Sequence, residues 1–323
     1  MPVINWIIKS KPNQKKTQSG QKEERMKSTK SIFAITLVTG LLFFLTPLTM
    51  ASTGMKAMGT ITIFKKGSVT IHSYMSPLDS ALVTSHIIET KNRLVVIDAQ
   101  FVRPYAKELR GYVDRLNKPI DRMIVSHNHP DHWFGLEFFT DVPIYSLRET
   151  RDLIEKTGDF FIKKNRERMG ELVTDKKVIP NMTIKEGKEL IDGLEYEFEK
   201  VLNAEAPVQL LIKFPELGTL VAQDLVYNNC HLVIGGKDAI NGWRQVLKRF
   251  QGMKEYGTIL AGHGEATNPA IYAKLLQYLE DAGAILATSK TGDEYKQKLL
   301  EKYPSYRFPL AINISISRLF RKQ

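Results

Sequence analysis

The sequence predicts an α/β fold in which two sheet-plus-helix halves pack sheet against sheet. Strand-like segments are followed by helical segments, and this order occurs twice, before and after about residue 180. The 323 residues suffice for one large domain or two small ones. The apolar and charged fractions, 43% and 25%, are those of a globular protein, and the single cysteine, Cys230, excludes an internal disulfide framework.

The first half begins with alternating apolar and polar residues. Lys65-Lys66-Gly67 separates two such runs and predicts a hairpin. A later stretch carries apolar side chains at helical spacing, including Tyr105, Leu109 and Val113. The predicted elements of this half are strands at 60–64, 68–72, 81–89, 93–97, 123–125 and 143–145, and helices at 105–116 and near 148–168.

The second half repeats the pattern. Trp243, Leu247 and Phe250 mark one helix, and Asn268-Pro269 is a favourable start for another, which runs to about residue 282. The predicted strands are 182–185, 194–201, 208–214, 218–223 and 258–261. The amphipathic tail, residues 292–323, is expected to add a helix and a strand whose role the sequence does not indicate.

Residues 1–51 are expected to be an N-terminal extension. Lys27 and Lys30 precede a fourteen-residue apolar run, 32–45, and Thr49-Met50-Ala51 provides small residues for cleavage. This pattern predicts a signal peptide over 26–51 and secretion, with the bacterial periplasm as the expected compartment. A retained membrane anchor over 31–55 is the alternative.

The expected domain organisation follows from this extension. A single catalytic domain is predicted over residues 52–290, with a C-terminal extension over 291–323. Residues 22–25 can be encoded by purine-only codons, like a ribosome-binding site, so we hypothesise that translation starts at Met26 and that 1–25 are not translated.

The net charge of +11 does not indicate a nucleic-acid-binding surface. Residues 1–51 hold eight basic and two acidic residues, which accounts for +6 of it. The other 272 residues carry a net +5 without a dense basic run. We therefore expect a small-molecule substrate, no nucleic-acid partner and no stable membrane association after signal removal; the sequence predicts no particular oligomeric state.

The most informative segment is Ser126-His127-Asn128-His129-Pro130-Asp131-His132, directly after the apolar run 123–125. Three imidazoles and a carboxylate at a strand end can be directed at two adjacent metal ions, because histidine is a common metal ligand and aspartate adds negative charge. Further candidates lie at other predicted strand ends. These are Asp98, Asp224 and His263.

With Asp224 and His263 following the cluster in this order, residues 58–288 resemble the metallo-β-lactamase superfamily. The resemblance implies an αββα sandwich of two mixed sheets flanked by helices, with two divalent metal ions between the sheet edges, usually zinc. It also implies the ligands: His127 and His129 at the first metal, Asp131, His132 and His263 at the second, Asp224 between both, and Asp98 orienting a ligand histidine.

One position departs from the common pattern. The first metal usually has a third histidine as ligand, but none lies between His132 and Asp224. Glu205, in Ala204-Glu205-Ala206-Pro207, is the expected replacement and is similar to the alkylsulfatase branch of the superfamily. Its oxygen ligation favours manganese or iron as alternatives to zinc at the first metal.

The expected function is a secreted binuclear metallohydrolase that uses a metal-bridging hydroxide on an ester, lactone or amide bond. Asp131 is expected to orient the hydroxide, and His231 to donate a hydrogen bond to the substrate. The alternatives are a β-lactamase, a sulfate-ester hydrolase, or an iron-dependent thiol or persulfide dioxygenase. The segment 232–236 lacks the arginine expected to bind a sulfate.

Overall fold

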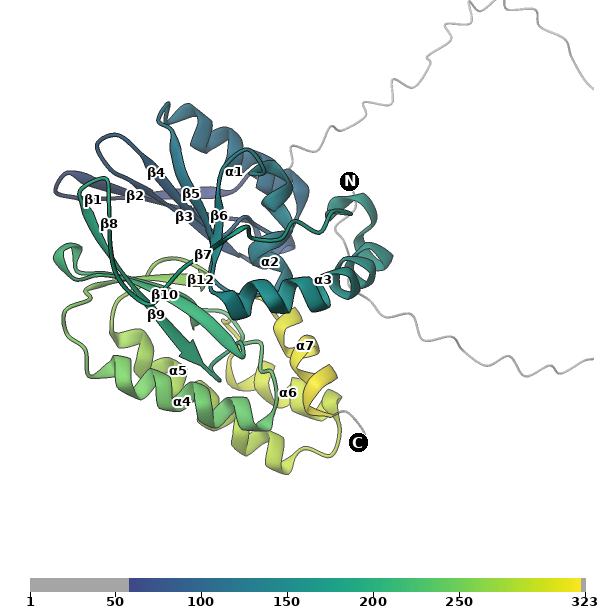
Figure 1. Ribbon diagram of the computed structural model, residues 1–323. Coiled ribbons are helices and arrows are strands. Elements are labelled where there is room, and N and C mark those ends of the chain that lie inside the picture. The colour runs from purple at the N-terminus through teal and green to yellow at the C-terminus, as the bar shows by residue number, and fades with distance from the viewer. Residues whose placement is uncertain (1–57, 321–323) are drawn as a thin grey trace, which may run out of the picture. The chain divides into compact units, whose positions relative to one another are not determined.

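Two mixed β-sheets face each other in the structure, a computed structural model that describes residues 58–320 (Figure 1). This arrangement confirms the predicted αββα fold class. Within that range, none of the helices combines the length and apolar character needed to cross a membrane. The signal peptide predicted over 26–51, the alternative anchor over 31–55 and the proposed start at Met26 lie outside the described residues.

The first sheet has seven strands in the order of the chain. Its neighbours are antiparallel from β1 to β4 and parallel from β4 to β7. The strands are β1 (Thr60–Lys66), β2 (Val69–Met75), β3 (Thr84–Glu89), β4 (Leu94–Ile97), β5 (Ile120–Val125), β6 (Ile144–Ser146) and β7 (Met182–Thr183).

The second sheet has five strands in the order β12-β11-β10-β9-β8, all antiparallel except the β11–β12 pair. Its strands are β8 (Gly187–Ile191), β9 (Leu194–Leu202), β10 (Val208–Phe214), β11 (Thr219–Tyr227) and β12 (Thr258–His263).

Helices cover the outer faces of the sandwich, with α1 on the first sheet and α4 and α5 on the second (Figure 1). The α-helices are α1 (Arg103–Arg115), α2 (Pro130–Trp133), α3 (Arg148–Met169), α4 (Lys237–Gln251), α5 (Ala270–Thr288), α6 (Gly292–Lys302) and α7 (Leu310–Leu319). The described residues also form 3-10 helices at η1 (Leu78–Ser80), η2 (Phe134–Phe138), η3 (Gly170–Leu172) and η4 (Pro215–Leu217).

The core has three apolar layers because central strands bury both faces. In β4, Val95 and Ile97 pack between the sheets, whereas Leu94 and Val96 pack under α1. Successive strand side chains point to opposite faces, so one short apolar run contributes to two layers. The third layer lies between the second sheet and the helices that follow it, including α6 and α7.

Two elements differ from the sequence predictions. Strand β8 was not predicted, because this edge strand buries only Ile191 and shows no apolar alternation. The end of the tail is helix α7 rather than the expected strand, although Ile312, Ile314 and Ile316 alternate as in a strand. Packing decides the outcome, since α7 buries Ile312, Ser315 and Leu319 at helical spacing.

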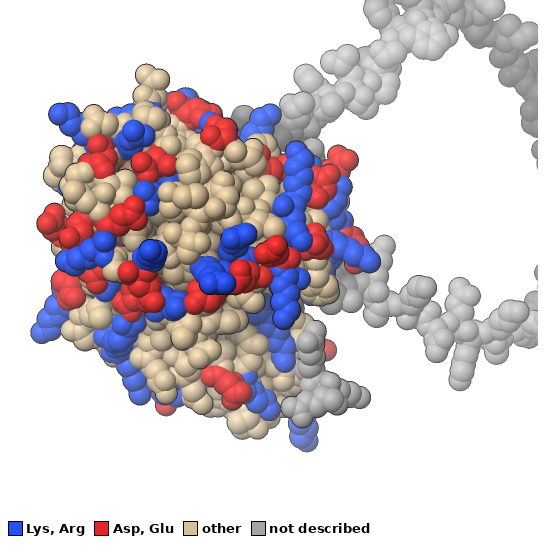
Figure 2. All heavy atoms as spheres, in the orientation of Figure 1, with Lys and Arg blue, Asp and Glu red and all other residues tan. Residues whose placement is uncertain are grey.

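Charges of both signs are interspersed on the face of the molecule shown in Figure 2. Lys200 is an example, because its ammonium group lies 2.9 Å from a carboxylate oxygen of Glu149 and 3.5 Å from one of Glu186. The coloured part of this view shows no broad, uniformly positive area of the kind that binds a phosphate backbone.

Candidate metal centre

The predicted ligands lie at one end of the sandwich, where the two sheets are joined. The backbone N–H of Leu210 in β10 donates to the carbonyl of Ser126, directly after β5, at 2.9 Å. Nearby, the Thr84 hydroxyl in β3 donates to the carbonyl of Ala261 in β12 at 2.5 Å. These bonds connect strand ends of different sheets, so residues distant in sequence meet at this edge.

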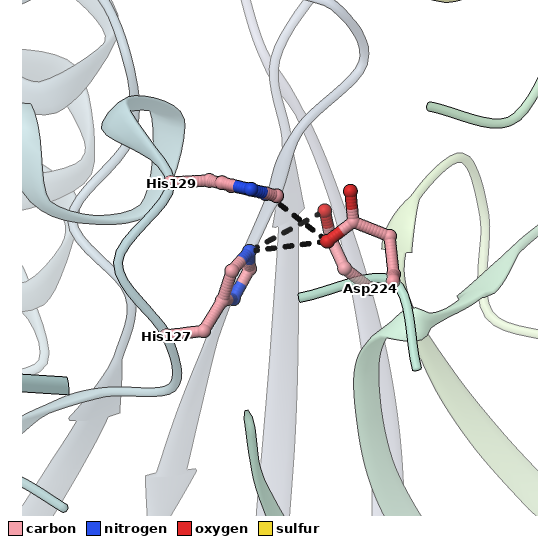
Figure 3. Close-up of side chains that lie close together, drawn as sticks. His127, His129 and Asp224 are labelled. Atoms are coloured by element: carbon pink, nitrogen blue, oxygen red, sulfur yellow. Dashed lines mark ion pairs between the residues drawn. The ribbon is translucent and has the colours of Figure 1, made fainter. Parts of the chain in front are cut away.

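The first group of candidate ligands comprises His127, His129, Glu205 and Asp224, whose donor atoms lie within 4.8 Å of one another. His127 Nε2 lies 3.6 Å from Asp224 Oδ2 and 3.8 Å from Glu205 Oε2. His129 Nδ1 lies 3.0 Å from Glu205 Oε2. Figure 3 shows His127 and His129 reaching from one loop toward Asp224 on the opposite sheet.

The second group comprises Asp131, His132 and His263, also within 4.8 Å. His263 Nε2 lies 3.3 Å from Asp131 Oδ2. Asp224 lies between the two groups, because its Oδ1 is 3.1 Å from His132 Nε2 and its Oδ2 is 3.3 Å from His263 Nε2. The seven residues therefore form two adjacent sets of donors around one shared carboxylate.

An irregularity in β11 orients Asp224. The parallel pairing of β11 with β12 shifts register on both sides of Gln223, whose φ of 42° is left-handed. Such bulges redirect side chains next to functional sites. The neighbouring strand β12 needs a glycine at position 262, because a Cβ there would lie 1.9 Å from Asp224 Oδ1. The sequence expectation of a strand ending before Asp224 was therefore wrong, since β11 continues to Tyr227.

Several candidate donor atoms of the site are buried and have no hydrogen-bond partner in the described part of the chain. Buried polar atoms normally have a partner, so a cluster of unpartnered nitrogen and carboxylate atoms is what a bound cation would satisfy. The residues present therefore fit divalent metal ions. The unpartnered atoms include His127 Nε2, His132 Nε2, Glu205 Oε1 and Asp224 Oδ1.

Hydrogen bonds behind the ligands set their orientation. Asp98 accepts from His132 Nδ1 at 2.7 Å and from the Ser126 hydroxyl at 2.7 Å, as well as from Gln223 Nε2 at 2.5 Å. His263 Nδ1 donates to the carbonyl of Ala81 at 2.8 Å. In each histidine the bonded Nδ1 leaves Nε2 free to face the centre. The sequence analysis did not identify Gln223, although it directly precedes Asp224.

Burial and the charges of neighbouring side chains shift the pKa values of this cluster. Burial lowers the pKa of His127 well below its usual value, so its imidazole is neutral, as a metal ligand must be. Burial alone would lower the pKa of His132 too, but the charges of Asp224, Asp98 and Asp131 raise it well above the usual value. Burial raises the pKa of Glu205, and the nearby imidazole of His129 only partly offsets this rise. The cluster therefore favours positive charge at its centre.

Aromatic rings hold His263 from both sides. Its ring stacks on Tyr227 at 4.4 Å between centroids and on Phe308 at 5.2 Å. The Tyr227 hydroxyl donates to Asp224 Oδ2 at 2.9 Å, so it supports a ligand instead of facing a substrate. Phe308 lies in the tail, 45 residues after His263, and no sequence signal links the two.

The structure does not include His231 in either group of ligands found among the described residues. Its Nδ1 lies 2.9 Å from the hydroxyl of Tyr278 in α5, and its ring packs against Tyr306. The side chain is fully buried, and burial lowers its pKa to about 4, so the imidazole is neutral. Its predicted role as a hydrogen-bond donor to the substrate stays a prediction.

Comparisons with known proteins agree with this fold. The family model described as the metallo-beta-lactamase superfamily matches residues 80–263. A metallo-beta-lactamase from Pontibacter korlensis aligns with a TM-score of 0.54 and 19% identity, covering 69% of this chain and 100% of that one. Metallo-beta-lactamase IND-7 aligns with a TM-score of 0.54 and 19% identity, covering 68% and 98%. No curated protein matches the chain.

Proposed function

Because the chain belongs to the metallo-β-lactamase superfamily, whose members are metallohydrolases, we propose that it is a binuclear metal-dependent hydrolase of ester, lactone or amide bonds. One observation carries the proposal: the shared carboxylate, Asp224, lies between two sets of donors. Two divalent ions bound there would lower the pKa of a shared water, so that a hydroxide nucleophile is available at neutral pH.

The side chains have separable tasks in this proposal. His127, His129 and Glu205 would hold the first ion, and Asp131, His132 and His263 would hold the second, with Asp224 available to both. Asp131 is suited to orient the nucleophile, because its side chain is 20% exposed whereas His132 and Asp224 are buried. The Asp131 carboxylate can accept a hydrogen bond from a group on its solvent-exposed side while its Oδ2 lies 3.3 Å from His263 Nε2.

The donor set bears on the choice of metal. Four imidazoles and three carboxylates suit zinc, which accepts both nitrogen and oxygen ligands. Three carboxylate charges and one hydroxide balance two divalent ions, so the centre itself is neutral. Zinc is the proposed metal, with manganese or iron as alternatives at the first position because Glu205 supplies oxygen there.

A second candidate function is oxidation of a thiol or persulfide by an iron-dependent dioxygenase. His127, His129 and Glu205 together offer two imidazoles and one carboxylate, the set that non-haem iron oxygenases use. Iron content and oxygen consumption with a persulfide substrate would separate this candidate from hydrolysis.

We also propose that the protein is secreted, on the strength of the signal-like pattern over 26–51. The measurement is the N-terminal sequence of the protein recovered from the periplasm or medium. Ser52 as the first residue supports secretion with cleavage after Ala51. Protein found only in the cytoplasm or membrane fraction, with residues 26–51 still attached, contradicts it.

The main proposal is tested by metal analysis of the purified protein combined with a substrate panel. The panel contains carboxylic esters, lactones, β-lactams and a sulfate ester, each assayed after loading with zinc or manganese. We expect two metals per chain and hydrolysis that chelation abolishes. Fewer than two metals per chain, with no hydrolysis restored by either ion, would contradict the proposal.

A further inference from the structure

The tail of the chain, beyond the residues matched by the family model, contacts the metal centre through Phe308, whose ring stacks on His263. The Ser315 hydroxyl of α7 lies 2.8 Å from the backbone N–H of Ile234 and accepts from it. The backbone N–H of His231 donates to the carbonyl of Arg307 at 2.9 Å. These bonds join α7 and the residues before it to segment 231–236, which follows β11. The tail is therefore held in a defined position next to the ligands.

Arg318, one turn after Ser315 on α7, extends to the same segment. A Cβ built on the exposed Gly235 would lie 3.8 Å from Arg318 Nη1 and 3.6 Å from the backbone oxygen of Glu205. Glycine at 235 thus leaves room for the guanidinium next to the Glu205 loop. The positive charge of Arg318 also counters the rise that burial causes in the pKa of Glu205.

The guanidinium acts on Glu205 through its charge, but it forms no ion pair at contact distance among the described residues. Within residues 58–320, no hydrogen bond or ion pair joins Arg318 to another side chain, and its residue is only partly buried. Other arginines of the fold, such as Arg110 with Asp141 and Arg307 with Glu265, are paired with carboxylates. An arginine fork without a carboxylate partner is suited to bind an incoming carboxylate, sulfate or phosphate.

The net charge of the proposed centre determines how strongly it attracts an anion, and Arg318 lies close enough to contribute to that charge. The three ligand carboxylates and a hydroxide neutralise two divalent ions, so the centre exerts little net attraction on an anion. Arg318 supplies the nearby positive charge that the centre lacks. It also stands beside segment 232–236, where the sequence has no arginine of its own.

We propose that Arg318 is a substrate-binding residue that recognises an anionic group, so that the preferred substrates carry a carboxylate, sulfate or phosphate apart from the scissile bond. This inference rests on the proposed metal centre, which holds the reacting group, while Arg318 holds the anion. It narrows the substrate class from esters, lactones or amides in general to anionic ones.

Equilibrium binding of dicarboxylates tests the proposal without requiring turnover. The purified, zinc-loaded protein is titrated calorimetrically with three dicarboxylates, succinate, glutarate and adipate. Each is paired with the monocarboxylate of the same chain length, which is butanoate, pentanoate or hexanoate. The variants are Arg318→Met, Arg318→Lys and, as a control that removes an exposed charge on α4, Lys248→Met. The readout is the ratio of Kd values within each pair, because effects on the metals alone alter both members equally.

We expect at least one dicarboxylate to bind about tenfold more tightly than its partner, the effect of one charge-assisted hydrogen bond. Arg318→Met should reduce this ratio to about one, Arg318→Lys should keep part of it, and Lys248→Met should leave it unchanged. A ratio of one in the unmodified protein, or a ratio that survives in Arg318→Met, overturns the inference.

The two proposals fail in different ways. If the protein binds two metals and hydrolyses neutral esters but shows no dicarboxylate preference, the inference is wrong and the proposed function stands. If the preference exists and depends on Arg318 while fewer than two metals bind and nothing is hydrolysed, Arg318 binds anions but the proposed function is wrong. Unchanged binding of the monocarboxylates in Arg318→Met shows that the variant is folded.

Discussion

At the scale of single residues, the candidate centre is distinguished by one carboxylate at a position where a histidine is usual. Glu205 is buried and its carboxylate lies 3.0 Å from His129, close to the residues that it is expected to join as a ligand in place of a third imidazole. Burying a charge is costly unless an opposite charge or a metal accompanies it. The surroundings of Glu205 offer only partial compensation, so the residue depends on a cation more than an imidazole would.

Replacing Glu205 by alanine should release the first metal while the second stays bound. Changes in residues that only support a ligand weaken metal binding about 10–100-fold, and the loss of a ligand should exceed this. Metal content after dialysis against a weak chelator measures the effect. Glu216→Ala, which removes an exposed glutamate, serves as the control. Two metals retained in Glu205→Ala would remove this residue from the centre.

At the scale of elements, short strands and the turns between them set the positions of the ligands. The bulge in β11 turns Asp224 toward both groups of donors, and β12 approaches it closely at Gly262. Because the two strands are parallel neighbours, a change in one backbone moves a side chain carried by the other.

Gly262→Ala should displace Asp224 and weaken both metals together, unlike Glu205→Ala. The added Cβ would lie 2.7 Å from the backbone nitrogen of Asp224 as well as near its carboxylate, and such overpacking costs about 1–3 kcal/mol. Metal content and thermal unfolding measure both effects. Gly257→Ala is the matched control, because no atom lies within 4 Å of its added Cβ. Selective loss of one metal would contradict a shared Asp224.

A second element-scale prediction concerns the junction of β2, β3 and α1, away from the centre. The carboxylate of Glu89 lies 2.8 Å from the ammonium group of Lys118 and accepts from His72 Nε2 at 2.9 Å, while His72 Nδ1 accepts from the Tyr112 hydroxyl. Burial raises the pKa of Glu89, but the bonds to Lys118 and His72 outweigh it and lower the pKa below 4.5.

Because its pKa is lowered by folding, Glu89 stabilises the fold above about pH 4.5, and this contribution is lost as the pH falls through the pKa of the folded state. Glu89→Gln should therefore reduce the free energy of unfolding by about 1 kcal/mol near pH 7, with a smaller difference near pH 3. Urea unfolding at both values measures this, with Glu216→Gln as the exposed control. An equal difference at both values would contradict the role of the charge.

At the scale of the whole molecule, the C-terminal helices belong to the core of the second half. One buried apolar cluster joins these helices to α4 and α5. It contains Tyr295 and Leu299 of α6, Phe308 between the helices, and Ile312 and Leu319 of α7. The tail thereby closes the third apolar layer, stacks on His263 and positions Arg318.

Removing residues 291–323 should prevent stable folding of the remaining chain. Losing a large buried apolar side chain costs about 2–5 kcal/mol. The truncation removes five such side chains, so the summed loss is comparable to or larger than the usual stability of about 5–15 kcal/mol. The measurement is cooperative thermal unfolding together with binding of a dye to exposed apolar surface. Removal of 321–323 alone is the control. A truncated chain that unfolds cooperatively without binding dye would show that the tail is dispensable.

The sequence was most informative where neighbouring residues act together. The histidine cluster at 127–132 spans six residues after an apolar run, so its local spacing predicted a metal centre. The superfamily came from a resemblance, carried by this cluster with Asp224 and His263 after it. The strand ends at Asp98 and His263 were predicted for the same reason. Local patterns were less reliable for β8 and α7, where apolar periodicity was absent or suggested a different element.

By itself, therefore, the sequence determined the two-sheet fold class, the superfamily and the types of side chain in the candidate metal centre. Only the tertiary structure decided how the distant parts meet: Glu205 beside His129, Asp224 turned by a bulge, Phe308 on His263 and Arg318 beside Gly235. The physical reason is that these contacts depend on the packing of sheets and helices far apart in the chain. Such packing is set by burial across the whole molecule and leaves no periodic signal in any one segment.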